Sequence, residues 1–252
     1  MRRSFVLAAL VLVVPAALAG QGPGRGGFAP DSLRNIRALP STMTPIEVVG
    51  FMRNVTGALG VRCTFCHVGE EGRPLTTYDF ASDDKPTKRE AREMIRMVQA
   101  INAQFISQLP ERQAPPFEVT CETCHRGVAV PRSLVDILGL AAQAGGADSA
   151  ARAYRALREL YYGRAAYDFG EATLGIVSQR LVRGQRLDDA LVVARLNAEF
   201  YPQSSQVQTN IGEVLRVRGD TTGAIAAYRQ ALQLNPQDGG ARQRLRELGQ
   251  QP

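Results

Sequence analysis

Two copies of the pattern Cys-x-x-Cys-His constrain this chain more strongly than any other feature of its sequence. Together they use every cysteine and every histidine of the 252 residues. Two thiols at this spacing can each form a thioether bond with a haem vinyl group, which places the adjacent histidine beside the iron. We therefore predict two covalently attached c-type haems. The predicted attachment residues are Cys63, Cys66, Cys121 and Cys124, and the predicted proximal ligands are His67 and His125.

A lone Cys-x-x-Cys pair would also fit a disulfide, a redox site or half of a zinc site, because thiolates serve all three. Two alternatives to haem therefore exist for this chain, namely paired disulfides and one zinc ion shared by all four cysteines. The histidine that directly follows each pair favours haem over both.

The N-terminal residues have the pattern of an export signal. An arginine pair and an apolar run precede Ala17-Leu18-Ala19, so we expect residues 1–19 to be cleaved off. The apolar run is shorter than the roughly 18 residues that span a membrane, and no cysteine lies near Gly20 to carry a lipid. Residues 20–30 are rich in Gly and Pro and should form a flexible lead. These features predict a periplasmic protein whose mature chain has no membrane span.

The charges of the chain argue against nucleic acid as a partner. Residues 31–132 contain thirteen basic and twelve acidic residues, and residues 133–252 contain fourteen and twelve. A nucleic-acid footprint needs basic residues clustered on one face, and the sequence shows no such cluster. Since the two halves also differ in composition and motifs, we expect two domains.

Local signals predict a helix directly before the first motif. Thr44 can cap this helix, Pro45 suits its first position, and Glu47 completes a capping box. Gly57 and Gly60 then let the helix stop and the chain turn into the motif. The apolar residues of the helix recur at helical spacing and form one inward-facing stripe. They are Val48, Val49, Met52, Val55 and Leu59.

A second helix is expected before the second motif. It should begin with a capping box at Thr87 and Glu90 and should end before Pro110, which cannot continue a helix. Its apolar stripe carries Met94 at the centre and Met97 at the edge. A loop from Pro110 to Pro116 then leads to the second motif.

Methionine is the expected second axial ligand of each iron, because no histidine is left for that position. A methionine on an apolar stripe normally packs in the core. Because each haem iron needs a second axial ligand, however, we favour Met52 as that ligand at one site. At the other site we favour one of Met94 and Met97, and the position on the stripe prefers Met94. Thioether ligation predicts comparatively high reduction potentials.

The second half of the chain predicts a helical repeat domain. Residues 133–147 end in an Ala/Gly-rich run and are expected to form a linker. Within residues 148–252, Ala190 aligns with Ala224 and Pro202 with Pro236 at a 34-residue period, as in a tetratricopeptide repeat. The alternative is a pair of generic helical hairpins. The expected fold class is all-α, with a dihaem domain over residues 31–132 followed by these repeats.

The first half also resembles the cytochrome c subunit of photosynthetic reaction centres. The resemblance is carried by Met43 to Pro45, Gly50 to Met52, Leu59 to His67, Ala91 to Met97 with Ile101 and Asn102, and Val119 to Gly127. It implies helix–turn–haem units, helices that lie alongside the haem planes, and electron transfer to an oxidised pigment pair. It also implies that Met52 and Met94 are the axial methionines.

This chain departs from that family in several ways. The family's subunit carries four haems in two halves, whereas this chain has one half. A histidine that the family supplies to a haem of the other half corresponds to Gln108 here, and the lipidated cysteine of many members is missing. The resemblance therefore implies fold and ligation more directly than a photosynthetic role.

The leading functional prediction is a dihaem electron carrier, not an enzyme, with redox proteins as partners and a repeat domain that docks one of them. The alternative is a haem enzyme, either a peroxidase or a small-molecule reductase, which needs one open iron position. A third hypothesis makes the repeats the main function and the haems a structural or sensory cargo.

Overall fold

The computed structural model of the chain describes residues 30, 32–109 and 117–252. The described residues form helices and turns, and their one β pairing is an isolated bridge between Val68 and Asp79. The all-α fold class predicted from the sequence is thus confirmed. The expected signal, nearly all of the expected lead, and the loop over residues 110–116 lie outside the described residues.

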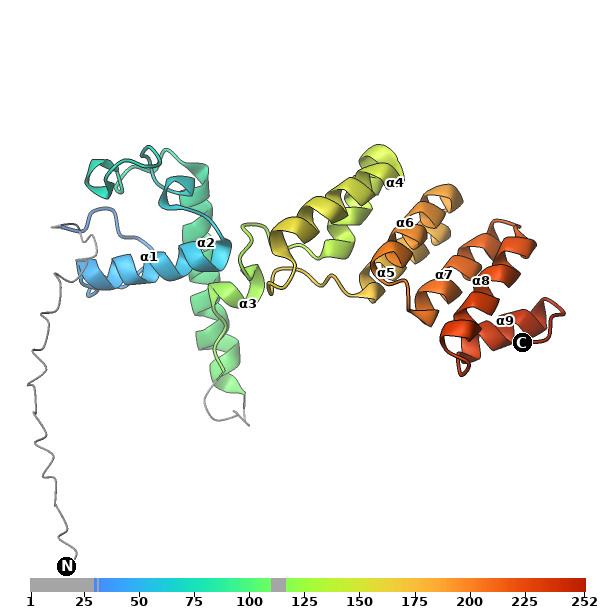
Figure 1. The fold of residues 1–252 in the computed structure, drawn as a ribbon. Helices are drawn as coiled ribbons and strands as arrows, with labels where there is room; N and C mark the ends of the chain where they lie inside the picture. The colour runs from blue at the N-terminus through green and yellow to red at the C-terminus, as the bar shows by residue number, and fades with distance from the viewer. Residues whose placement is uncertain (1–29, 31, 110–116) are drawn as a thin grey trace, which may run out of the picture.

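The molecule is elongated, with the two motifs at one end and a row of stacked helices at the other (Figure 1). The motif-bearing end contains α1 (Pro45–Leu59), α2 (Pro86–Ala100) and the short α3 (Cys121–His125). The row contains α4 (Leu134–Tyr161), α5 (Glu171–Arg183), α6 (Leu187–Phe200), α7 (Ser205–Val217), α8 (Thr221–Leu234) and α9 (Gly239–Glu247).

The start and the end of α1 agree with the sequence prediction. The Thr44 backbone N–H donates to Glu47 Oε2 at 2.7 Å, and the Glu47 N–H donates to Thr44 Oγ1 at 3.4 Å, which completes the capping box. Gly60 ends the helix in the left-handed region with a φ of 65°. α1 therefore delivers the chain into the first motif through a turn that glycine favours.

The start of α2 differs from the prediction. The helix begins at Pro86, and Thr87 does not cap it. Instead, Thr87 Oγ1 donates to the carbonyl oxygen of Phe65 at 2.5 Å, so this hydroxyl fastens the helix to the first motif. After Ala100 the chain continues through a π turn, Ile101–Phe105, and a 3₁₀ turn, Ile106–Gln108, and helical structure thus stops before Pro110.

The expected linker over residues 133–147 is instead part of α4 and of the repeat core. Leu138 and Ala142 are fully buried, because they recur at the helical interval of four and face the same neighbours. The glycine pair interrupts the helix only locally, with non-helical dihedrals at Gly145 and Gly146. The Ala147 N–H then donates to Asp189 Oδ1 at 2.7 Å. The Ala/Gly-rich run is therefore a kink inside a packed helix.

The helices after α4 stack as antiparallel hairpins, with α5 against α6 and α7 against α8. Ala190 and Ala224, which share the 34-residue alignment, are both fully buried. Gly212 allows the closest approach in this stack, because a Cβ there would lie 2.5 Å from the Tyr228 ring. The small residues of the repeat alignment thus lie where helices touch, as stacked helical repeats require.

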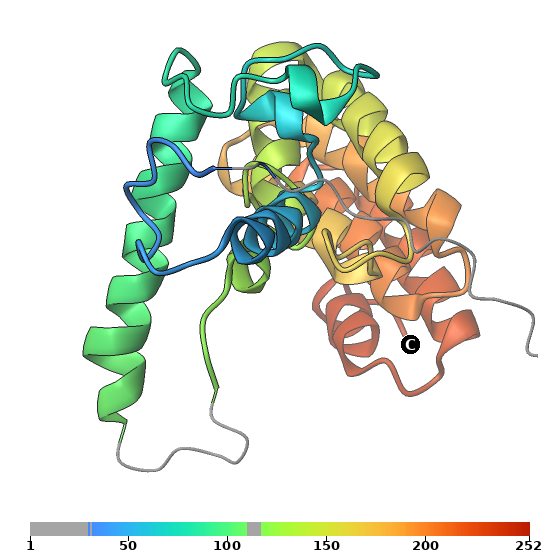
Figure 2. The same cartoon turned by 90° about the vertical axis from the view of Figure 1, so that its left-hand side faces the viewer.

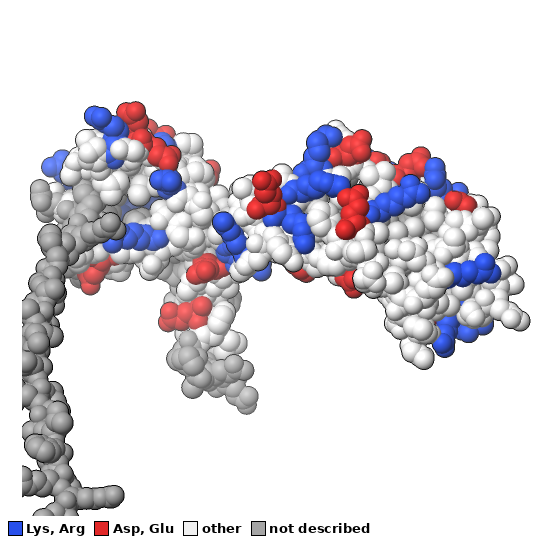
Figure 3. Space-filling view, viewed as in Figure 1, with Lys and Arg blue, Asp and Glu red and all other residues white. Residues whose placement is uncertain are grey.

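Acidic and basic side chains are interspersed over the repeat helices on the face shown in Figure 3. Several of them pair between helices, including Arg180 with Asp136 at 2.8 Å and Arg218 with Asp188 at 2.7 Å. This mixed surface does not form the single-sign field that nucleic-acid binding needs.

Candidate haem sites

The first motif folds back on itself directly after α1. Cys63–Phe65 forms a 3₁₀ turn, and the backbone N–H groups of Cys66 and His67 both donate to the Cys63 carbonyl, at 3.2 and 2.9 Å. This turn brings both thiols and the imidazole to one side of the chain. All three side chains line a cavity of about 390 Å³. Met52, on the inward face of α1, lines the same cavity.

The walls of this first cavity come from several segments that are distant in sequence. α1 and α2 face each other across it, and the segment of residues 32–39 runs between them (Figure 2). The volume falls in the range of cofactor pockets, which are mostly apolar with a few placed polar groups. The apolar lining includes Val48, Val49, Val55, Leu75 and Ile95.

His67 lines this cavity in the protonation state that a metal ligand needs. Burial, reinforced by the positive charge of Lys88, lowers the pKa of His67 to about 4, so the imidazole is neutral at pH 7. Neutral imidazole is the form that binds metals. Its Nδ1 is buried and has no hydrogen-bond partner among the described residues. Since buried polar atoms are nearly always paired, this incompletely paired imidazole fits a cofactor in the cavity.

The thiols of the first motif do not resemble a redox pair. Burial raises the pKa of the Cys66 thiol, whereas reactive cysteines have a lowered pKa. All four cysteines are free thiols in the described structure. No group of three or more His, Cys, Asp or Glu among the described residues could hold a metal ion, so the four cysteines do not converge on one zinc site.

The second motif forms the short helix α3. Thr120 and Thr123 cap its start through the Thr120 N–H, which donates to Thr123 Oγ1 at 2.9 Å. His125 Nδ1 lies 2.9 Å from the carbonyl oxygen of Val128. Because a carbonyl can only accept, Nδ1 carries the proton, and Nε2 is left with its lone pair for a metal. His125 is therefore oriented and in the tautomer that an axial ligand needs.

An amide clamp fixes the approach to the second motif. Asn102 Nδ2 donates to the Val119 carbonyl at 2.7 Å, and the Val119 N–H donates to Asn102 Oδ1 at 2.8 Å. Asn102 lies in the π turn that follows α2, and such turns are frequent at functional sites. The two bonds tie the methionine-bearing helix to the segment that leads into Cys121. No local sequence pattern announces this pairing, because the partners are 17 residues apart.

The two motifs are held together where one glycine meets another. The Gly127 N–H, directly after the second motif, donates to the Ala58 carbonyl near the end of α1 at 2.7 Å. A Cβ on Gly60 would lie 2.1 Å from the Gly127 carbonyl oxygen. The exit of the second motif thus packs against the entry to the first, and two haems attached here would be held at a fixed separation.

The methionines of α2 do not line the first cavity. Ala91, Arg92 and Ile95 on another face of the helix line it, whereas Met94 and Met97 are 46% and 45% exposed. These similar exposures do not discriminate between the two methionines, so Met94 as the ligand of the second iron stays a prediction. Phe105, Leu109 and Phe117, which precede the second motif in sequence, are also exposed.

A charge network closes one side of the first cavity. Asp83 Oδ1 forms ion pairs with Arg92 at 2.9 Å and Lys88 at 3.2 Å, and it accepts a hydrogen bond from Asn35 Nδ2 at 2.8 Å. These contacts, with the Arg92 hydrogen bond as the largest cause, hold the pKa of Asp83 well below its ordinary range. Lys88 is buried and also donates to the Phe80, Ala81 and Ser82 carbonyls. The sequence prediction missed this network.

Residues 70–152 match the family described as Photosynthetic reaction centre cytochrome C subunit. This segment belongs to that family. It contains α2, the second motif and the first part of α4, whereas the first motif lies just before it. The family therefore supports a covalently bound c-type haem and electron transport. The matched segment ends at residue 152, inside α4, the helix that begins the repeat row.

Curated relatives agree with this family. Cytochrome c-554 of Chloroflexus aurantiacus is 40% identical over 84 residues, which are 33% of this chain and 18% of that protein. The photosynthetic reaction center cytochrome c subunits of Thermochromatium tepidum and Rubrivivax gelatinosus are 33% and 34% identical over 101 and 95 residues. Those alignments cover 36% and 34% of this chain and 24% of each relative. The chain thus spans less than a quarter of the length of these cytochromes.

Proposed function

We propose that this chain is a periplasmic electron carrier that holds two covalent haems and docks a redox partner through its repeat helices. Its place among haem cytochromes follows from the family segment. The observation that carries the two-haem proposal is the first cavity, in which Cys63, Cys66, His67 and Met52 meet although the family match begins after them. Cys63 and Cys66 would attach the haem, and His67 and Met52 would supply ligands to its iron.

The residues of each site would keep the iron six-coordinate. When bound, the haem supplies a one-electron couple at its iron. His67 and Met52 would hold the iron of the first haem, and His125 and Met94 would hold the iron of the second. A thioether opposite an imidazole favours the ferrous state and raises the reduction potential. Because no axial position is then open to a substrate, the chemistry left to the protein is electron transfer.

A haem enzyme is the competing function, and the exposure of Met94 and Met97 favours it at the second site. If neither methionine bound the second iron, that iron would be open to a small molecule. Carbon monoxide added to the reduced native protein at neutral pH distinguishes the two functions. An electron carrier does not bind it rapidly, whereas rapid binding to one equivalent of haem would show an open site and overturn the carrier proposal.

The proposed location rests on the sequence of residues 1–19, which has the pattern of a cleaved export signal. None of the helices that the structure describes is long and apolar enough to cross a membrane. Determining the N-terminal residue of protein purified from the periplasm tests the location, with Gly20 expected. An intact Met1 would contradict it.

The repeat helices carry a groove suited to a polypeptide partner. The groove has a volume of about 200 Å³ and lies between α5 and α7. Two buried amide atoms in its lining, Asn197 Oδ1 and Asn210 Nδ2, have no hydrogen-bond partner among the described residues. One can accept and the other can donate, which matches the N–H and C=O groups of an extended chain. We assign partner docking to this groove.

Two substitutions in the full-length holoprotein test the docking. Ile176 lines the groove and is 41% exposed, whereas Val192 on α6 is 40% exposed and does not line it. Ile176→Glu should slow electron transfer to the native partner, most visibly at low protein concentration, and Val192→Glu should not. Equal rates for both variants would overturn the docking assignment. Ending the chain near Leu138 is a poorer test, because the cut would pass through the packed part of α4.

A further inference from the structure

The first cavity is lined by far more positive than negative charge. Its only acidic lining residue among those described is Asp79, whose Oδ1 accepts the backbone N–H groups of Ala81 and Ser82 at 2.9 Å each. Asp79 is therefore engaged with its own loop. The basic lining residues are Arg34, Arg37, Arg53, Arg62, Lys88 and Arg92.

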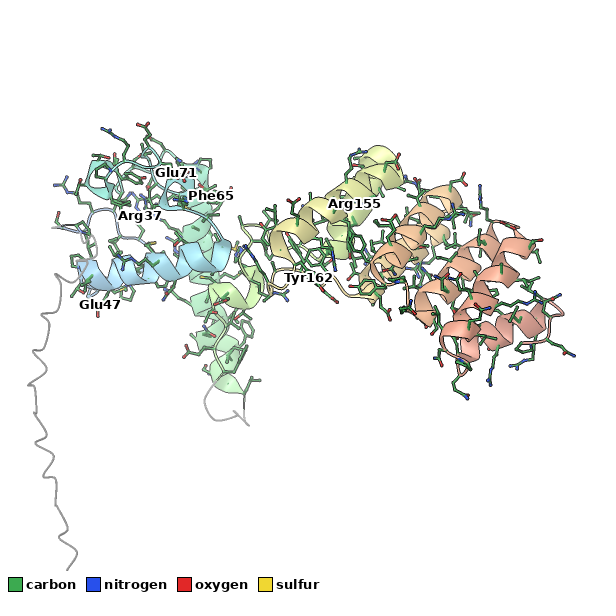
Figure 4. All side chains as sticks on the ribbon, in the orientation of Figure 1. Arg37, Glu47, Phe65, Glu71, Arg155 and Tyr162 are labelled. Carbon is green, nitrogen blue, oxygen red and sulfur yellow. The ribbon has the colours of Figure 1, made fainter. Side chains whose placement is uncertain are left out.

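Four of these six cations already have an acidic partner. Lys88, Arg92 and, at 3.9 Å, Arg37 share Asp83, and Arg62 pairs with Glu71 at 2.8 Å. Figure 4 places Arg37 between α1 and the loop that carries Glu71. Arg34 and Arg53 also line the cavity, and among the described residues neither side chain has an ion pair or hydrogen bond like those of the other four cations.

Both unpaired arginines are carried by backbone that the structure holds in place. Arg53 follows Met52 on α1. Arg34 lies in the segment of residues 32–39, which other contacts fasten to α2: Arg92 donates to the Asn35 carbonyl at 3.0 Å, and Gln99 donates to the Ala38 carbonyl at 3.0 Å. Arg34 and Arg53 therefore line the same cavity from two different segments.

We propose that Arg34 and Arg53 bind the two propionate carboxylates of the haem at the first motif. This inference rests on the proposed function, because it needs a haem in this cavity. Guanidinium is the side chain best matched to a carboxylate, since its planar fork can donate two parallel hydrogen bonds. The segment of residues 32–39 and α1 would then hold the haem together, and the two cations would raise the reduction potential of this haem alone.

The test is a redox titration of the holoprotein with Arg34→Gln, Arg53→Gln and the double variant. Each single substitution should lower the potential of one haem, by roughly a threefold to tenfold change in its ferric-to-ferrous ratio, where tenfold is about 59 mV. The other haem should be unchanged. Arg73→Gln is the matched control, because Arg73 is exposed in the same domain and does not line the cavity.

Conservative variants separate charge from folding. Arg34→Lys and Arg53→Lys keep the positive charge. The reduction potential of the first haem in these variants should stay close to that of the wild type, even where the glutamine variants load haem poorly. Shifts in the glutamine variants no larger than in Arg73→Gln would overturn the inference, as would lysine variants that behave like glutamine variants. Failure of the inference alone would leave a wild-type protein with haem at the first motif, whereas a wild-type protein without that haem would contradict the proposed function.

Discussion

Replacing Gly60 by alanine tests the junction that holds the two motifs together. Gly60 has a φ of 65°, which costs a residue with a side chain about 1–2 kcal/mol. The added Cβ would lie 2.1 Å from the Gly127 carbonyl oxygen. The Gly127 backbone cannot retreat freely, because its N–H is bound to the Ala58 carbonyl. Overpacking of this kind costs about 1–3 kcal/mol, so we expect a total destabilisation of about 2–5 kcal/mol.

Gly127→Ala is the matched control at the same junction. Gly127 has a φ of 89°, but a Cβ there would meet nothing within 4 Å, so this variant has the backbone strain without the clash. Thermal unfolding of the holoprotein, followed by the visible absorption of the haems, measures both. Because 1 kcal/mol shifts the midpoint of a domain of this size by about 4–8 °C, Gly60→Ala should unfold at least about 4 °C below Gly127→Ala. Equal midpoints would refute the contact.

Three further predictions concern ligation, pH and the amide clamp. Met52→His and Met94→His should each lower the reduction potential of a different haem, because imidazole replaces thioether on iron. A redox titration in which both substitutions lower the potential of the same haem would contradict the assignment. Since the pKa of Asp83 is held below its ordinary 3.8, mainly by the Arg92 hydrogen bond, its contribution to stability should be complete above pH 3.8 and should fall below it. Melting midpoints of Asp83→Asn should lack that dependence. Asn102→Ala should cost about 1–3 kcal/mol through two unpaired backbone groups and should alter the spectrum of the second haem only.

Local signals predicted well the helix that leads into the first motif. The capping box at Thr44 and the left-handed turn at Gly60 involve residues at most four positions apart, and both are present. The helical stripe placed Met52 on the inward face of α1, where it lines the cavity with His67. These predictions succeeded because each depends on residues that are close in sequence.

The predictions that failed depend on tertiary contacts. Thr87 could cap α2, but its hydroxyl bonds to the Phe65 carbonyl, 22 residues away. Residues 133–147 looked like a linker because of their Ala/Gly content, yet Leu138 and Ala142 pack into the core of the repeat helices. Asp83 gained its role from Asn35, 48 residues away. No window of local sequence contains such partners.

The most direct test of the two-haem proposal is a spectroscopic redox titration of the purified holoprotein. We predict two one-electron transitions, with a methionine-to-iron charge-transfer absorption from each ferric haem. Met94→Leu should abolish that absorption at the second haem, and Met97→Leu should not. A single transition, or a ferric spectrum without the methionine absorption, would contradict the proposal.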